Sequence, residues 1–121
     1  MSHLLDVNFL LACAWRSHAD HRMAPSWLEK QASFSTCSIS QLGLLRVSLS
    51  PGYRASSPDA LEALREITTH MHAHVIADDL SGEDIAAVSS HSEVTAASLV
   101  ALSRAYGLKL TTLDRALCEK P

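Results

Sequence analysis

The sequence lacks an excess of basic residues. Ten Lys and Arg residues stand against 13 Asp and Glu residues in a chain of 121, which gives a formal net charge of −3. Proteins that hold nucleic acid by general electrostatic attraction carry the opposite sign. Any binding of nucleic acid must therefore use a local basic patch or a bound metal ion.

Paired cysteines and long apolar runs are also missing. Cys13, Cys37 and Cys118 lie far apart and form no Cys-x-x-Cys pair, so neither a zinc knuckle nor a disulfide framework is predicted. The longest apolar stretches are interrupted by Asp6 and Asn8, well short of the roughly 20 residues that a membrane span needs. The first residues show no basic leader. We expect a cytoplasmic protein, with no membrane segment and with reduced thiols.

The residues that are present suit one folded unit. Hydrophobic residues make up 47% of the chain, and the length predicts a single domain over residues 1–121. Short apolar runs alternate with helical patterns along the chain. Strands are predicted at residues 3–5, 34–37, 74–77 and 108–111, and helices at 7–15, 21–31, 38–49, 58–67 and 95–106, with a weak one near 85–88. This alternation favours an α/β fold with a parallel sheet covered on both faces.

Helix caps and inner faces can also be predicted from spacing. The predicted N-caps are Ser38, Ser57 and Thr95. Apolar residues at helical spacing predict these buried faces: Ile39, Leu42, Leu45 and Leu49; Leu61, Leu64 and Ile67; Leu99, Leu102 and Tyr106. Gly107 is expected to end the last of these helices.

Two aspartates follow the first and last predicted strands. In a parallel sheet, Asp6 and Asp114 would both lie at the carboxyl edge, where ligands bind. Converging carboxylates repel each other, and a divalent cation such as Mg²⁺ or Mn²⁺ offsets that repulsion. Aspartate is equally a good N-cap for the helical turn that follows it. Position alone leaves both roles open, and the two are compatible.

Five sequence strings, in order, point to a known family. They are His3-Leu-Leu-Asp6-Val-Asn8, Ile39-Ser-Gln41-Leu-Gly-Leu-Leu-Arg46-Val, His74-Val-Ile-Ala-Asp78-Asp79-Leu-Ser, Glu93-Val-Thr95-Ala96-Ala-Ser-Leu, and Gly107-Leu-Lys-Leu-Thr-Thr112-Leu-Asp114-Arg115. Together they resemble PIN-domain ribonucleases, above all the VapC toxins of VapBC toxin–antitoxin systems. The resemblance spans essentially the whole chain. It implies a three-layer α/β/α domain with a central, mainly parallel sheet of about four to five strands.

The resemblance also implies an activity and its partners. Carboxylates of the family bind Mg²⁺ or Mn²⁺ and direct a water onto an RNA phosphodiester. Asp6 matches the first metal-site aspartate, Asp114 the last, and Thr112 a hydroxyl that steadies the site. Expected partners are a structured RNA such as tRNA, a VapB-type antitoxin and a second copy of the chain in a homodimer.

One departure bears directly on this activity. The family reads Thr-Asp-Ala where this chain reads Thr95-Ala96-Ala97, so a principal metal-binding carboxylate is replaced by alanine. We expect weak metal binding and cleavage reduced by orders of magnitude, with the fold retained because alanine is a good helix former. Deliberate inactivation explains a single change better than natural decay does. The alternative is a degenerate PIN module that binds RNA or antitoxin without cutting.

Several further residues are candidates for lining the site or contacting RNA. They are Asn8, Gln41, Arg46 and Arg115, with Asp79 as a replacement for the missing charge or, more simply, as a helix cap. Gln41 stands where many relatives have glutamate, and it can hydrogen-bond a metal-bound water. His70, His72 and His74 alternate, but solvated or capping roles explain them better than metal binding, since imidazole clusters select zinc-like ions.

Overall fold

The part of the chain that the structure describes has four parallel strands in one sheet, in the order β3-β2-β1-β4. The computed structural model describes residues 3–81 and 93–114. Along the chain, the elements are β1 His3–Leu5, α1 Val7–Ala14, α2 Met23–Glu29, β2 Phe34–Thr36, α3 Ser38–Ser48, α4 Ser57–Thr68, β3 Ala73–Val75, α5 Val94–Ala105 and β4 Lys109–Thr111. The predicted strands are confirmed, and so are the five main helices, with small shifts of their ends. The weak helix predicted near 85–88 lies outside the described residues.

The order of the strands places a switch point beside β1. The chain steps from β1 to β2 and then to β3 on one side, and β4 adds to the other side of β1. Leu4 is paired with Ser35 on one neighbour and with Leu110 on the other. In open parallel sheets, ligands bind at the carboxyl ends of strands where the order reverses. The carboxyl ends of β1 and β4 are therefore the position that this topology offers to a site.

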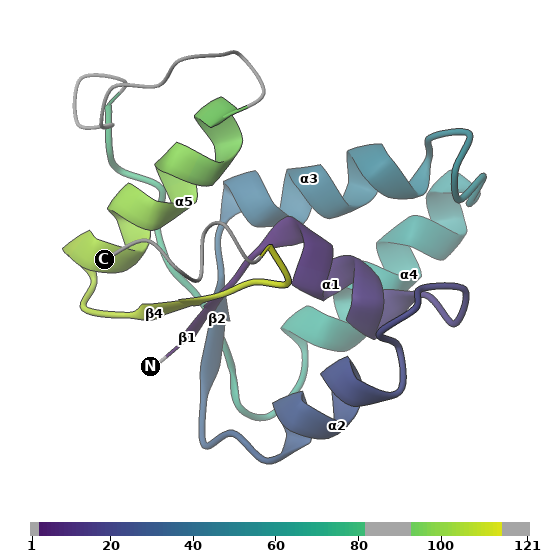
Figure 1. Cartoon of the computed structure of the whole chain (residues 1–121), viewed down its shortest axis with the longest axis horizontal. Helices are drawn as coiled ribbons and strands as arrows, with labels where there is room; N and C mark the ends of the chain where they lie inside the picture. Colours follow the sequence, from purple (N-terminus) through teal and green to yellow (C-terminus); the bar gives the residue numbers. More distant parts are fainter. Residues whose placement is uncertain (1–2, 82–92, 115–121) are drawn as a thin grey trace.

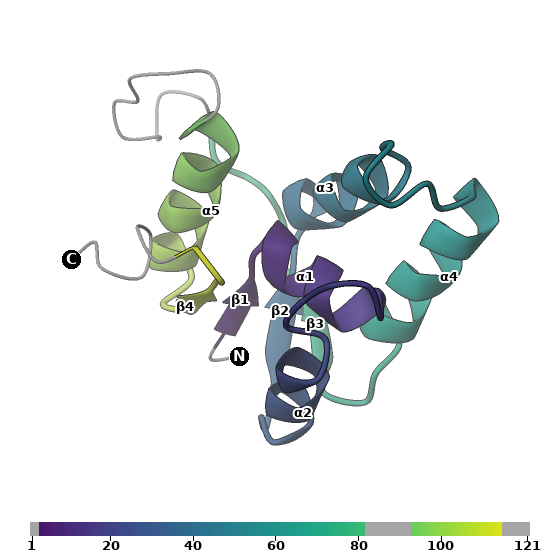
Figure 2. The same ribbon diagram turned by 45° about the vertical axis from the view of Figure 1, so that its right-hand side comes forward.

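Helices cover both faces of the sheet. Leu5 and Phe34 point into an apolar core shared with α1, α2, α3 and α4. The neighbouring residue Leu4 points the other way, into a second core formed with Leu99 and Leu102 of α5. Successive strand residues alternate between faces, so each central strand supplies both cores. Figures 1 and 2 show α5 on one side of the sheet and the other four helices opposite, which confirms the predicted three-layer α/β/α fold.

The predicted inner face of α3 is wrong at Leu42 and Leu49, although Ile39 packs against the second core. Leu42 is 64% exposed and Leu49 is 49% exposed, while Ser40, Gly43, Leu44 and Ser48 are buried. The reason is the close approach of α1. A Cβ on residue 43 would lie 2.5 Å from a methyl carbon of Val7. Small residues therefore face α1, and Leu42 and Leu49 are turned outward.

The inner face of α4 is only partly as predicted. Ala60 and Ile67 are buried and Leu64 packs against the core, whereas Leu61 is exposed. For α5 the prediction is confirmed at Leu99 and Leu102. No helix within residues 3–81 and 93–114 is long and apolar enough to cross a membrane.

The predicted N-caps are each displaced toward the N-terminus. Cys37, not Ser38, caps α3, and the hydroxyl of Ser40 accepts a bond from the Cys37 amide. Ser56, not Ser57, caps α4 and accepts from the backbone N of Asp59 at 3.2 Å. The helix α5 begins before Thr95, with Glu93 at the cap position. At α4, the spacing between the cap hydroxyl and the amide that it binds decides which of the two serines takes the role.

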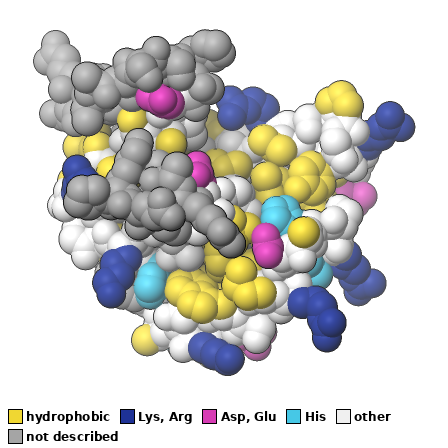
Figure 3. Space-filling model, viewed as in Figure 1, with side chains coloured by type: hydrophobic (Ala, Val, Ile, Leu, Met, Phe, Trp, Pro, Cys, Tyr) yellow, Lys and Arg dark blue, Asp and Glu magenta, His cyan; other side chains and the backbone are white. Residues whose placement is uncertain are grey.

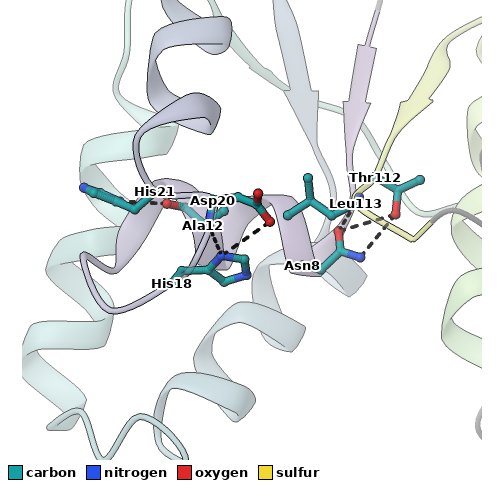
Figure 4. A network of polar contacts seen from close by, with 7 residues as sticks. All are labelled: Asn8, Ala12, His18, Asp20, His21, Thr112 and Leu113. Carbon is teal, nitrogen blue, oxygen red and sulfur yellow. Dashed lines mark hydrogen bonds and ion pairs between the residues drawn. The ribbon is translucent and has the colours of Figure 1, made fainter.

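A histidine closes the far end of α1. The Nδ1 of His21 lies 2.8 Å from the carbonyl oxygen of Ala12, in the last turn of the helix (Figure 4). Because a carbonyl can only accept, His21 donates from Nδ1. This bond satisfies one of the carbonyls that a helix leaves open at its C-terminus. It fixes the chain that leads from α1 into α2.

Candidate active site

Asp6 is both a helix cap and a buried carboxylate at the sheet edge. It directly follows β1, and its backbone N donates to the carbonyl of Thr111 at 2.9 Å, which continues the pairing with β4. Its Oδ1 accepts from the backbone N of Val7 at 2.7 Å, at the start of α1. The residue is only 7% exposed. The capping role predicted for Asp6 is thus confirmed, and it leaves the second carboxylate oxygen for other contacts.

Thr112 joins the two aspartates. Its Oγ1 lies 2.6 Å from Oδ2 of Asp6, and the backbone N of Asp114 lies 3.0 Å from the same Oγ1. A hydroxyl has one proton, and an ionised carboxylate can only accept, so Thr112 donates to Asp6 and accepts from Asp114. Two residues 108 positions apart in the sequence are brought together through this hydroxyl. Asp114 itself is exposed.

Asn8 lies beside this group on the first turn of α1. Its Oδ1 accepts from the backbone N of Leu113 at 3.1 Å, and its Nδ2 lies 3.3 Å from Oγ1 of Thr112. Figure 4 shows the amide pointing from α1 toward the segment that follows β4. The predicted site residues Asp6, Asn8, Thr112 and Asp114 therefore form one connected group at the end of β1 and β4.

Ala96 lies in the first turn of α5 and is partly buried. The helix packs against β1, β4 and α3, and Figure 1 shows its first turn toward the end of the sheet where α3 begins. The methyl group of Ala96 offers no oxygen to a cation. Within residues 3–81 and 93–114, no group of three His, Cys, Asp or Glu side chains is placed to hold a metal ion. The oxygen donors of Asp6 and Asp114 suit Mg²⁺ or Mn²⁺ in kind, and alanine stands where the third carboxylate is expected.

Gln41 is tied to the neighbouring strand. It lies in the first half of α3, and its Nε2 donates to Oγ1 of Thr36 at 2.9 Å. Thr36 ends β2 and is 1% exposed. Sequence reasoning did not single out Thr36, although a hydroxyl at the end of a buried strand beside a predicted site is a usable signal. Arg46 is exposed in the last turn of α3, about 7.5 Å farther along the helix axis than Gln41.

Other candidates are placed elsewhere or fall outside the description. Asp79 accepts a hydrogen bond from the hydroxyl of Tyr106 at 3.3 Å, at the C-terminal end of α5, whereas Ala96 lies at the opposite end of that helix. Desolvation and the nearby carboxylate of Asp79 raise the pKa of Tyr106. Arg115 lies outside the described residues. The imidazole of His70 accepts from the backbone N of His72 at 3.1 Å, a local structural contact.

A separate cavity of about 220 Å³ lies between α2 and α4. Leu28, Phe34 and Ile67 line it, together with Cys13 and the polar side chains of Glu29, Glu66 and His70. Burial raises the pKa of Cys13 to about 12. The thiol therefore stays protonated near neutral pH and is a poor nucleophile. This cavity shares no lining residue with the group around Asp6.

Sequence comparison finds VapC ribonucleases over nearly the full length, although no family model matches the chain. The chain is 36% identical to Ribonuclease VapC38 of Mycobacterium tuberculosis over 121 residues, covering 92% of this chain and 84% of the relative. It is 33% identical to Ribonuclease VapC39 of the same species, covering 98% and 93%. Identity to Ribonuclease VapC29 is 31%, covering 98% and 90%.

A solved structure agrees with the fold. The crystal structure of Mycobacterium tuberculosis VapC20, described as a toxin that cleaves the sarcin–ricin loop, superimposes with a TM-score of 0.70 at 16% identity. The match covers 97% of this chain and 93% of that one. With the identity to the three ribonucleases over most of its length, the chain belongs to the VapC family of PIN-domain ribonuclease toxins.

Proposed function

We propose that this chain has the architecture of a metal-dependent endoribonuclease toxin and that Ala96 leaves this form without effective cleavage. The observation that carries the proposal is the Asp6–Thr112–Asp114 group at the switch point between β1 and β4. It places two carboxylate residues where a parallel sheet binds its ligands. The names of the relatives supply the class of reaction, hydrolysis of RNA.

Asp6 and Asp114 would hold Mg²⁺ or Mn²⁺. A divalent cation in such a site activates a water and neutralises charge on a phosphodiester undergoing in-line displacement. Asp6 is prepared for this role because the Val7 amide and the Thr112 hydroxyl hold one oxygen each. A carboxylate offers about four lone-pair positions, so both oxygens keep acceptor capacity for a cation. Thr112 fixes the orientation of the carboxylate.

The replacement at residue 96 would cost activity through the cation. With only two carboxylates, the site binds a divalent cation less tightly and leaves the attacking water poorly activated. The second candidate function, a PIN module that binds RNA or antitoxin without cutting, rests on the same alanine. The two candidate functions predict different results when a carboxylate is restored at residue 96.

The deciding experiment restores the carboxylate. Ala96→Asp should gain Mn²⁺-dependent cleavage of tRNA by at least about tenfold over the parent chain. Ala97→Asp adds the same charge one residue along the same helix and should gain nothing. Adding Asp6→Ala to Ala96→Asp should abolish the gain. A chain that stays inactive after Ala96→Asp, on a panel of tRNA, ribosomal RNA fragments and single-stranded RNA, supports the non-cutting module instead.

The partners follow the same proposal. On the face drawn in Figure 3, hydrophobic side chains gather over α1 and α2, and most Lys and Arg side chains lie around its rim. An antitoxin of the VapB type would cover the apolar part of such a face. The exposed Leu42 and Leu49 of α3 support a homodimer of the free, cytoplasmic toxin. Light scattering of the purified chain over a series of concentrations tests the dimer, and a monomer throughout the series would contradict it.

A further inference from the structure

The contacts of Asn8 have one consistent hydrogen-bonding pattern. The backbone N of Leu113 can only donate, so the side-chain atom 3.1 Å from it must be the amide oxygen. The amide nitrogen then faces Oγ1 of Thr112 at 3.3 Å. The donors and acceptors around Asn8 thus determine which way the amide points.

The hydroxyl of Thr112 can serve all three neighbours in this arrangement. Its one proton goes to Oδ2 of Asp6 at 2.6 Å, and its two lone pairs accept from Nδ2 of Asn8 and from the backbone N of Asp114. The 3.4 Å approach of Thr112 Oγ1 to the oxygen of Asn8 therefore carries no hydrogen bond of its own.

The pairing of β4 with β1 ends just before this group. The last paired residues are Leu5 and Thr111, and the backbone N of Asp6 adds one bond to the carbonyl of Thr111. Residues 112 to 114 therefore continue beyond the sheet ladder. Asn8 bonds to the first of them through a hydroxyl and to the second through a backbone amide. It ties this segment to the start of α1, the helix that Asp6 caps.

We infer that Asn8 is a positioning residue that holds Asp114 beside Asp6 and thereby sets the affinity of the site for its divalent cation. This inference rests on the proposed metal site. Asn8 acts through the hydroxyl of Thr112 and the backbone amide of Leu113. Residues outside the coordination sphere can orient the carboxylates that bind a metal ion. Removing such a residue typically lowers metal affinity by about 10–100-fold.

The test measures metal binding and not cleavage. Mn²⁺ binding to the full chain is followed by the loss of the free-ion signal in electron paramagnetic resonance, in an Ala96→Asp background that has three carboxylates. Asn8→Ala should raise the Kd about tenfold. The amide proton of Leu113 should exchange faster at the same time. Alanine is a better helix former than asparagine, so α1 should persist.

Two controls separate positioning from general loosening. Cys13→Ala removes a partly buried side chain from the same helix, away from residues 112–114, and should leave the Kd unchanged. Asn8→Ser, with a side chain too short to span to Leu113, should show the same loss as Asn8→Ala, and it serves if the alanine variant folds poorly. In an Asp114→Ala background, Asn8→Ala should have no further effect on Kd, because the residue it positions is gone.

The outcomes distinguish this inference from the proposed function. An Ala96→Asp chain that takes up no Mn²⁺ would overturn the metal site and the role of Asn8 together. Normal Mn²⁺ affinity after Asn8→Ala would overturn only the role of Asn8. An equal loss with and without Asp114 would also overturn it, because Asn8 would then act through something other than that carboxylate.

Discussion

Replacing Thr112 by valine tests whether its hydroxyl organises the site. Valine keeps the branched shape of threonine and removes only the hydroxyl. Asp6, 7% exposed, would lose the donor that now lies 2.6 Å from its Oδ2. The amides of Asn8 and Asp114 would lose their shared acceptor. The largest loss falls on Asp6, because its charge is buried and the other two groups lie nearer to water.

The size of the effect follows from the bond to the carboxylate. A hydrogen bond to a charged group contributes about 1.5–3 kcal/mol, and a neutral bond about 1 kcal/mol. We expect Thr112→Val to lower the free energy of unfolding by about 2 kcal/mol and the Tm by about 8 °C for a chain of this length. Thr111→Val is the matched control, since it removes a hydroxyl from a neutral partner, Nδ1 of His3 at 3.2 Å. It should cost about 1 kcal/mol or less.

Urea titrations of both variants, followed by circular dichroism, measure the difference. Thr112→Ser restores the hydroxyl and should recover most of the loss. If Thr112→Val costs no more than Thr111→Val, the hydroxyl does not stabilise the Asp6 carboxylate. Thr112 would then lie between the two aspartates without contributing to stability through Asp6.

Three further predictions concern packing and titration. Gly43→Ala should lower the free energy of unfolding by about 1–3 kcal/mol, because its Cβ would lie 2.5 Å from a methyl carbon of α1. Gly52→Ala is the control: its Cβ would have its nearest neighbour at 3.8 Å and should change stability little, so equal effects of the two substitutions would contradict the prediction. Burial lowers the pKa of His3 from 6.5, so the unfolded state takes up the proton more readily and stability is lost as the pH falls below about 6.5; His3→Gln should flatten this slope between pH 7.5 and 5.5 in urea titrations. With its pKa raised to about 12, Cys13 should be alkylated at pH 8 far more slowly in the native chain than in urea. Mass spectrometry of the labelled peptides measures both rates, and equal rates would contradict the prediction.

The elements of the fold were predictable because their signals are local. Short apolar runs gave the strands, and Gly107, with a φ of +67°, ends α5 as its position predicts. The inner face of α3 was not predictable from the same rule. Leucines at helical spacing indicate a buried stripe, but the close contact of Gly43 with Val7 rotates the helix so that small residues face α1. That contact joins α1 and α3, so it cannot be predicted from the sequence of either helix alone.

The candidate site divides in the same way. The sequence alone places Asp6 and Asp114 at the same edge of the sheet, because each directly follows a strand and the carboxyl ends of parallel strands share one edge. The role of Asn8 could not, because its partners lie 104 and 105 residues away and one of them is a backbone amide, which has no signature in the sequence. Thr36 differs from Asn8, because its partner Gln41 is only five residues away and its hydroxyl at the end of a buried strand is a signal that the sequence does carry.

The dual role of Asp6 bears on what Ala96 changes. One carboxylate oxygen caps α1 and the other accepts from Thr112, so the orientation of this carboxylate is fixed by groups that belong to α1 and to the segment after β4. Ala96 belongs to neither; it lies on α5, on the other face of the sheet. Its replacement by aspartate would therefore bring a third carboxylate to a pair already held in place. If the pair were instead organised by the carboxylate of residue 96, Ala96→Asp would have to change the exchange rates of the Leu113 and Asp114 amides without added metal. Unchanged rates, followed by protection on adding Mn²⁺, are the result that a preformed pair predicts.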